Sequence, residues 1–92
     1  MSVTVRLPGA LRDAAGGETK LSASGETLRE LIVDIDRRHP GFASRLLDDA
    51  GGLRSYVNVY IGDEDARTRG GSGAAVPDGS EVMVIPAMAG GC

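Results

Sequence analysis

The chain has 92 residues, 41% of them hydrophobic and 25% charged, and its formal net charge is −3 at pH 7. This length suits a single domain with one modest core, and the acidic balance argues against nucleic acid as a partner. No apolar run is long enough to span a bilayer, so we expect no membrane partner either.

The number of cysteines and the first residues of the chain indicate in which cellular compartment the protein is expected. A single cysteine cannot form an internal disulfide, which fits a reducing cytosol. The chain does not start with a basic stretch followed by an apolar one, as a secretion signal would. We therefore expect a cytoplasmic protein.

The first residues of the chain predict a β-hairpin. Residues 2–7 alternate strictly, with Val3, Val5 and Leu7 on one face of a half-buried strand. After a turn-rich connection, residues 18–22 are expected to return as an edge strand.

A helix follows the hairpin. Thr27 and Glu30 form the T-x-x-E capping box, which satisfies backbone donors at a helix start. Apolar residues then recur at helical spacing and form one stripe: Leu28, Leu31, Ile32 and Ile35. Basic residues in the last turn suit the helix dipole, and Pro40-Gly41 ends the helix. Residues 42–47 predict a short helical turn that fills the core.

Three features of the chain could suggest a bound ion, and none predicts a site. His39 is a lone histidine, and the Asp48-Asp49 pair is not followed by further oxygen ligands at loop spacing. Residues 67–73 are glycine-rich but lack the Lys-Ser/Thr of a phosphate loop, so we expect an exposed, mobile loop there. We therefore predict no metal and no cofactor.

The remaining elements complete a sheet. Residues 56–61 alternate, with Val57, Val59 and Ile61 on one face of a second strong strand. A turn at 77–79 leads into residues 81–85, which are apolar on both faces and so predict a central strand.

Two strands, a helix and two or three further strands predict an α+β protein. Parallel first and last strands in mid-sheet, with the helix in their connection, satisfy the right-handed crossover rule. This arrangement is a β-grasp (ubiquitin-like) roll: a mixed sheet of four to five strands with one main helix packed on one face. We expect the domain to fill residues 1–86 and residues 87–92 to form a flexible tail.

The expected tail follows directly from the last strand. Pro86 ends the ladder, and only small or slender side chains come after it, up to Gly90, Gly91 and Cys92. Glycines weaken a fold, but a thin, bare backbone can enter a narrow channel in another protein. A frayed terminus is the alternative interpretation.

At this point the chain resembles a known family, the bacterial ubiquitin-like sulfur carriers of the ThiS and MoaD type, and within it the carriers of cysteine biosynthesis. The matching stretches are Val3-Thr4-Val5, residues 22–28, Val57-Asn58-Val59-Tyr60, Asp63-Glu64-Asp65, and Asp78-Gly79-Ser80-Glu81-Val82 followed by residues 85–91.

The resemblance implies a carrier that is not itself an enzyme. An E1-like enzyme would adenylate the Gly91 carboxylate, and sulfur would displace AMP to leave a thiocarboxylate. Ala89 and Gly90 would thread the partner's active site. A sulfur-accepting biosynthetic enzyme would be a further partner.

Cys92 departs from the simple family pattern, and three interpretations stay open. In the first, which we favour, a JAMM-type zinc peptidase removes Cys92 before Gly91 is activated. In the second, Cys92 is the product cysteine, amide-linked to Gly91 after thiocarboxylate chemistry. Or it is a redox or persulfide handle, which we rank last because no cationic neighbour activates its thiol.

Period-2 alternation also predicts where a partner would dock. If Val82 and Val84 face the helix, Met83 and Ile85 face outward, and Tyr60 does so on the neighbouring strand. An outward apolar patch beside the tail would receive the activating enzyme, unless loops cover it. Two rival functions remain: a ubiquitin-like modifier conjugated to lysines through Gly91, and a structural domain whose Gly-Gly is incidental.

Overall fold

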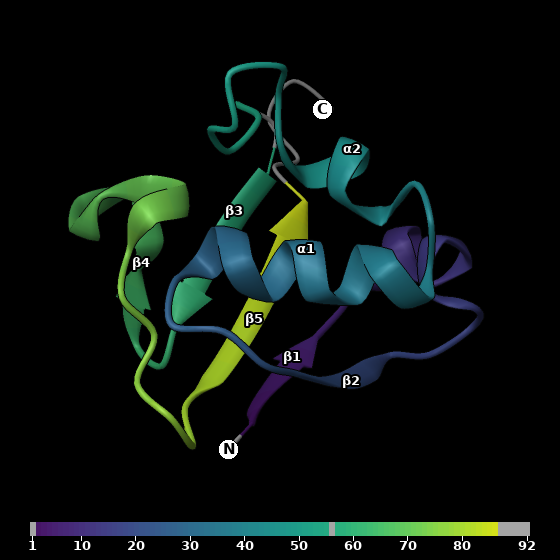
Figure 1. The fold of residues 1–92 in the computed structure, drawn as a ribbon, viewed down its shortest axis with the longest axis horizontal. Helices are drawn as coiled ribbons and strands as arrows, with labels where there is room; N and C mark the ends of the chain where they lie inside the picture. Colours follow the sequence, from purple (N-terminus) through teal and green to yellow (C-terminus); the bar gives the residue numbers. More distant parts are fainter. Residues whose placement is uncertain (1, 56, 87–92) are drawn as a thin grey trace.

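The computed structural model describes residues 2–55 and 57–86, and in this part of the chain one sheet carries a long helix on one face (Figure 1). The helix is α1 (Leu28–Arg38). The strands are β1 (Val3–Arg6), β2 (Lys20–Ala23), β3 (Val57–Ile61), β4 (Glu64–Asp65) and β5 (Glu81–Pro86).

The strand order is β2-β1-β5-β3-β4, with β5 in the middle. β5 runs parallel to β1 and antiparallel to β3, while β2 and β4 are the antiparallel edges. The predicted α+β class, the β-grasp roll and the central last strand are therefore confirmed.

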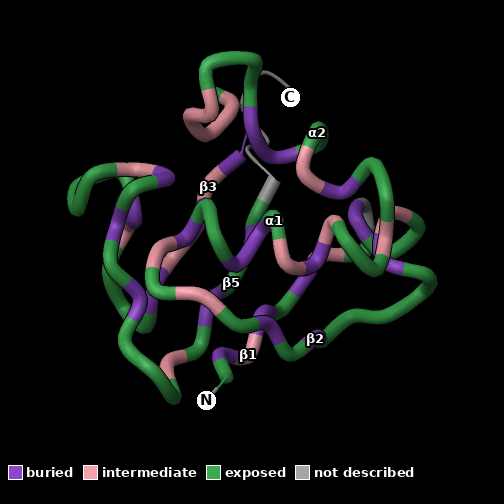
Figure 2. Tube along the Cα trace, in the orientation of Figure 1, coloured by how far each residue is buried: buried purple, intermediate pink, exposed green. Residues whose placement is uncertain are grey.

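The core lies between the sheet and α1, as the sequence patterns predicted (Figure 2). The strands contribute Val3, Val5, Leu21, Ala23, Val57, Val59, Ile61, Val82 and Val84, and α1 contributes Leu28, Leu31, Ile32 and Ile35. The short helix α2 (Phe42–Leu46) adds the buried side chains of Phe42 and Leu46. No helix within the described residues is both long and apolar enough to cross a bilayer.

The start of α1 differs in one bond from the predicted capping box. Thr27 is the N-cap, and its Oγ1 accepts from the Glu30 backbone N–H at 3.3 Å. The Glu30 carboxylate reaches past Thr27 and accepts from the Glu26 N–H at 2.9 Å. Both bonds still satisfy backbone donors, so the motif ends the preceding loop and starts the helix as expected.

We expected an exposed, mobile loop at residues 67–73; most of these residues are exposed, but the backbone forms helical turns and Ser72 is buried. The segment forms two 3-10 helices, Ala66–Arg69 and Gly71–Gly73. The Asp65 carboxylate caps the first, and Gly70 joins them with a φ of 112°, which favours glycine. Ser72 is buried, and its hydroxyl donates to the Gly51 carbonyl at 2.7 Å, so this turn is packed onto the domain.

Several element boundaries differ from the expected ones by one or two residues. The second strand begins at Lys20 rather than at residue 18, and it ends at Ala23, whose buried side chain joins the core. The acidic turn at residues 62–65 contains the two-residue strand β4, which pairs with the end of β3.

Candidate functional site

β5 is the element that leads to the predicted tail, and the fold holds it firmly. Val82 pairs with Val5 on one side and with Ile61 on the other. Val82 and Val84 are buried beneath α1, at 0% and 3% exposure. A strand bonded on both edges has little freedom to shift register, so the chain leaves the sheet at a fixed position at Pro86.

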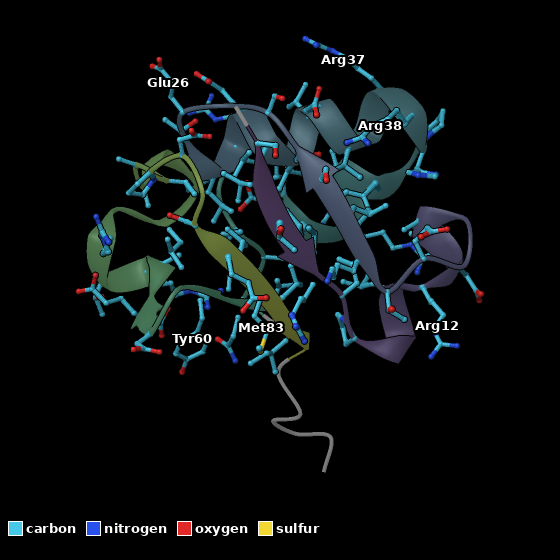
Figure 3. All side chains as sticks on the ribbon, turned by 90° about the horizontal axis from the view of Figure 1, so that it is seen from below. Arg12, Glu26, Arg37, Arg38, Tyr60 and Met83 are labelled. Atoms are coloured by element: carbon cyan, nitrogen blue, oxygen red, sulfur yellow. The ribbon has the colours of Figure 1, made fainter. Side chains whose placement is uncertain are left out.

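The other face of β5 is exposed and apolar. Met83 and Ile85 are 40% and 37% exposed, so loops do not cover them. Tyr60 pairs with Met83 on the neighbouring strand and is partly buried, and Figure 3 shows both on the side of the domain opposite to Arg37. We call Tyr60, Met83 and Ile85 the tail-side patch; their predicted outward orientation is confirmed.

A shallow depression extends the tail-side patch toward β1. It is lined by Arg6, Leu7, Pro8, Met83, Val84 and Ile85. The Arg6 guanidinium is ion-paired with Glu81, which offsets the charge at the edge of the depression. The depression therefore has an apolar floor and, on its β1 side, a margin whose charges are paired.

Arg67 is a neighbour of the patch that the sequence analysis missed. Its guanidinium donates to Asn58 Oδ1 at 2.9 Å and to the Arg54 carbonyl at 2.6 Å. Asn58 pairs with Ile85, so Arg67 brings a positive charge to the β3 side of the patch. No local pattern marked it, because it lies in the segment expected to be a loop.

The predicted tail residues lie outside the described part of the chain. These are Ala89, Gly90, Gly91 and Cys92, together with the expected flexible segment 87–92. Within the described residues, no group of three or more His, Cys, Asp or Glu side chains could hold a metal ion. The described residues present an exposed apolar surface on the sheet and a central strand, β5, that pairs with a neighbour on each edge.

Comparison with known proteins adds a family and two close structures. The model of the ThiS family matches residues 5–91. The sulfur carrier protein CysO of Mycobacterium tuberculosis is 44% identical over 93 residues, covering 99% of this chain and 100% of that protein. Its crystal structure superposes with a TM-score of 0.87 at 42% identity, covering 92% of this chain and 98% of the other.

A second crystal structure shows a relative bound to another protein. The BexX/CysO complex of Amycolatopsis orientalis matches with a TM-score of 0.88 at 42% identity, covering 92% of this chain and 94% of the matched chain. The small archaeal modifier protein 3 of Haloferax volcanii is 36% identical over 67 residues, 73% of this chain and 67% of that protein.

Proposed function

Since the chain belongs to the ThiS family, we propose that it is a sulfur carrier that holds its sulfur as a thiocarboxylate on Gly91. Carriers of this type are small protein substrates and not enzymes. The close similarity to CysO supports a place in cysteine biosynthesis.

The main support for this proposal is the range of residues that the family model matches. It extends from residue 5 through the described domain and ends at Gly91, one position before Cys92. The match therefore includes the Gly90-Gly91 pair with the domain that presents it. The central position of β5 supports the same assignment, because the strand that leads to the tail is paired on both edges and lies in the middle of the sheet.

Activation requires a free carboxylate on Gly91. A carboxylate oxygen attacks the α-phosphorus of ATP and releases pyrophosphate, giving an acyl adenylate. A sulfur nucleophile then attacks the acyl carbon, and AMP leaves with the C–O bond electrons. A Gly91 in peptide linkage to Cys92 has no such carboxylate, so a JAMM-type peptidase would have to hydrolyse that bond first.

The tail-side patch would dock the E1-like activating enzyme. An exposed apolar surface next to a substrate tail lets the enzyme gain affinity from the folded domain while Ala89 and Gly90 enter its active site. A related CysO has been found in complex with BexX, which supports the use of such a fold as a docking partner. A sulfur-accepting biosynthetic enzyme would receive the loaded tail.

ATP–pyrophosphate exchange with an E1-like enzyme tests this order of events. We expect the chain ending at Gly91 to support exchange and the chain retaining Cys92 to support none until a JAMM-type peptidase is added. Gly91→Ala in the shortened chain is the matched control and should exchange poorly, because a methyl group enters the narrow channel. Equal exchange by all three proteins would contradict the proposal.

Conjugation to lysines is the second candidate, supported by the similarity to a small archaeal modifier protein. Both functions share the Gly91 adenylate and diverge at the acceptor, which is sulfur in one and an amine in the other. Mass spectrometry after incubation with ATP, the activating enzyme and a sulfur donor distinguishes them. Isopeptide-linked products without thiocarboxylate would favour the modifier.

A further inference from the structure

An arginine lies on each side of the tail-side patch, and the two arginines differ in how their charge is balanced. On the β1 side, the Arg6 guanidinium is ion-paired with the Glu81 carboxylate. On the β3 side, the Arg67 guanidinium donates to two uncharged oxygens, Asn58 Oδ1 at 2.9 Å and the Arg54 carbonyl at 2.6 Å. Among the described residues, Arg67 forms no ion pair. One margin of the patch therefore carries a guanidinium with which no described carboxylate pairs.

Arg67 lies beside the end of β5 that leads to the tail. Its hydrogen-bond partner Asn58 pairs in register with Ile85, near the end of the strand. Arg6, on the other side, pairs with Met83, two residues further back along β5. A protein that covers Ile85 and binds the tail would therefore meet the Arg67 guanidinium.

Two carboxylates follow Arg67 closely in the sequence and stay charged, but neither is placed against its guanidinium. Glu64 pairs with Arg69 at 2.8 Å. Asp65 caps the 3-10 helix by accepting from the Arg67 backbone N–H at 2.9 Å. In register, Asp65 lies opposite the residue two positions along β3 from Asn58, which is about 7 Å along the strand. Asp65 reduces the positive potential at this margin but leaves the guanidinium donors unoccupied.

The Arg67 guanidinium retains the donors that a carboxylate needs. A guanidinium has five N–H groups in a rigid fork, and the bonds to Asn58 and Arg54 use one N–H each of Nη1 and Nη2. The described residues leave three N–H groups free, and two suffice for a bidentate contact with a carboxylate. The two existing bonds also hold the guanidinium in place, so binding a partner costs it little side-chain entropy.

The tail-side patch gives this guanidinium an apolar neighbour. Met83, Ile85 and Val33 are the large apolar side chains that are exposed in the described part of the chain. Met83 and Ile85 lie together on β5, whereas Val33 is the one exposed large apolar residue of α1. A partner that covers Met83 and Ile85 excludes water from the margin of the patch, and an electrostatic contact is stronger where water is excluded.

We propose that Arg67 is a specificity-determining residue for activation: its guanidinium binds a carboxylate of the E1-like enzyme whose apolar side chains cover Met83 and Ile85. This inference rests on the docking proposed above, and not on the sulfur chemistry at Gly91. A charged pair at the margin of an apolar interface acts mainly on the choice of partner and on the association rate. Arg67 therefore favours enzymes that present a carboxylate at this position and disfavours those that present a cation.

Suitable variants separate the charge of Arg67 from its structural bonds. Asn58→Asp keeps an oxygen acceptor at nearly the same position, but the new carboxylate pairs with the guanidinium and offsets its charge. Arg67→Gln removes the charge and weakens the link between the 3-10 helix and β3. Arg69→Gln is the matched control, because it removes one positive charge from the same 3-10 helix at a guanidinium already paired with Glu64.

Equilibrium binding of the full chain to the E1-like enzyme of its host, measured without ATP, reports docking before any chemistry. We expect Arg67→Gln and Asn58→Asp each to raise Kd by roughly tenfold, and Arg69→Gln to leave it within about twofold. Wild-type binding should weaken more steeply with salt than the binding of either affected variant. Asn58→Asp should melt no lower than the wild type, because its bond to Arg67 is kept and becomes an ion pair.

Activity of the chain ending at Gly91 separates this inference from the sulfur-carrier proposal. In ATP–pyrophosphate exchange, Arg67→Gln should raise KM by a similar factor and leave kcat unchanged, because the contact is made both before and during adenylation. Exchange with the same KM for the wild type and the variants would refute the role of Arg67 alone. Binding of the wild type without exchange would refute the chemistry at Gly91 and leave the Arg67 contact standing.

Four binding results would overturn the inference. If Arg67→Gln weakens binding and Asn58→Asp does not, Arg67 acts by holding the 3-10 helix against β3, and its charge is not recognised. If Arg69→Gln weakens binding as much as Arg67→Gln, the enzyme responds to net charge alone. If the wild-type chain self-associates in sedimentation and Arg67→Gln abolishes this, the guanidinium contacts a second copy of the chain. Absence of wild-type binding would refute the docking itself, and the inference with it.

Discussion

The two exposed surfaces of this domain are built in opposite ways. On the sheet, Met83 and Ile85 stand beside an ion pair, Arg6–Glu81, that neutralises its own charges. On α1, the Glu30 and Asp34 carboxylates accept from the domain's own backbone N–H groups, and Arg29 and Arg37 beside Val33 have no hydrogen bond or ion pair with any other described residue. The sheet face therefore combines an apolar centre with one positive charge from Arg67 at its β3 side, whereas the groove on α1 is lined by two arginines and two carboxylates around Val33.

The largest expected effect separates the two sides of α1. Leu31→Ala removes a fully buried side chain and should lower the free energy of unfolding by about 2–5 kcal/mol. Val33→Ala, on the exposed side, should change it by less than about 0.5 kcal/mol. Urea denaturation measures both, and similar losses would mean that Val33 belongs to the core.

The next effect separates the two surfaces in function. Met83→Asp combined with Ile85→Asp should reduce kcat/KM for adenylation of the chain ending at Gly91 by on the order of 100-fold, because the activating enzyme would bury two charges. Val33→Asp should leave kcat/KM unchanged. If the helix variant is the slower substrate, the activating enzyme docks on α1 and the assignment of the two surfaces is reversed.

A smaller change in the free energy of unfolding tests whether a carboxylate on α1, Asp34, stabilises the domain. Asp34→Ala removes the acceptor of the Ser24 N–H and the partner of Arg38, and should cost roughly 1 kcal/mol in unfolding free energy. Glu18→Ala is the control, since Glu18 is exposed and its side chain makes no hydrogen bond within the described residues. Equal stability of the two variants would show that Asp34 is not needed there.

The smallest effect concerns the ion pair on the sheet face. Both side chains of Arg6–Glu81 are about half exposed, at 52% and 49%. A double-mutant cycle with Arg6→Ala and Glu81→Ala should give a coupling below about 1 kcal/mol that falls as salt is added. A larger, salt-independent coupling would mean that the pair is structural and not a neutralised surface.

Most of the fold could be predicted from the spacing of apolar residues within each segment and from the order of the segments along the chain. Val3, Val5 and Leu7 alternate with polar residues in the sequence. This alternation alone predicted which face of the first strand is buried. Pairing of the first and last strands followed from the single helix between them and the crossover rule. The outward positions of Met83 and Ile85 needed only the side-chain period of 2.

What sequence analysis missed depends on contacts between distant residues. Ser72 is buried because Gly51, 21 positions away, offers it a carbonyl, and nothing near residue 72 indicates this. Arg67 reaches Asn58 and Arg54 in the same way. Arg29 and Arg37 are noticeable only once the structure shows that Glu30 and Asp34 are occupied elsewhere.

Intact mass of the protein purified from its own host under non-reducing conditions tests the sulfur-carrier account most directly. We predict molecules that end at Gly91, a fraction of them heavier by the difference between a sulfur and an oxygen atom. If every molecule keeps an unmodified Cys92, even with an E1-like enzyme and a JAMM-type peptidase supplied, the account is contradicted.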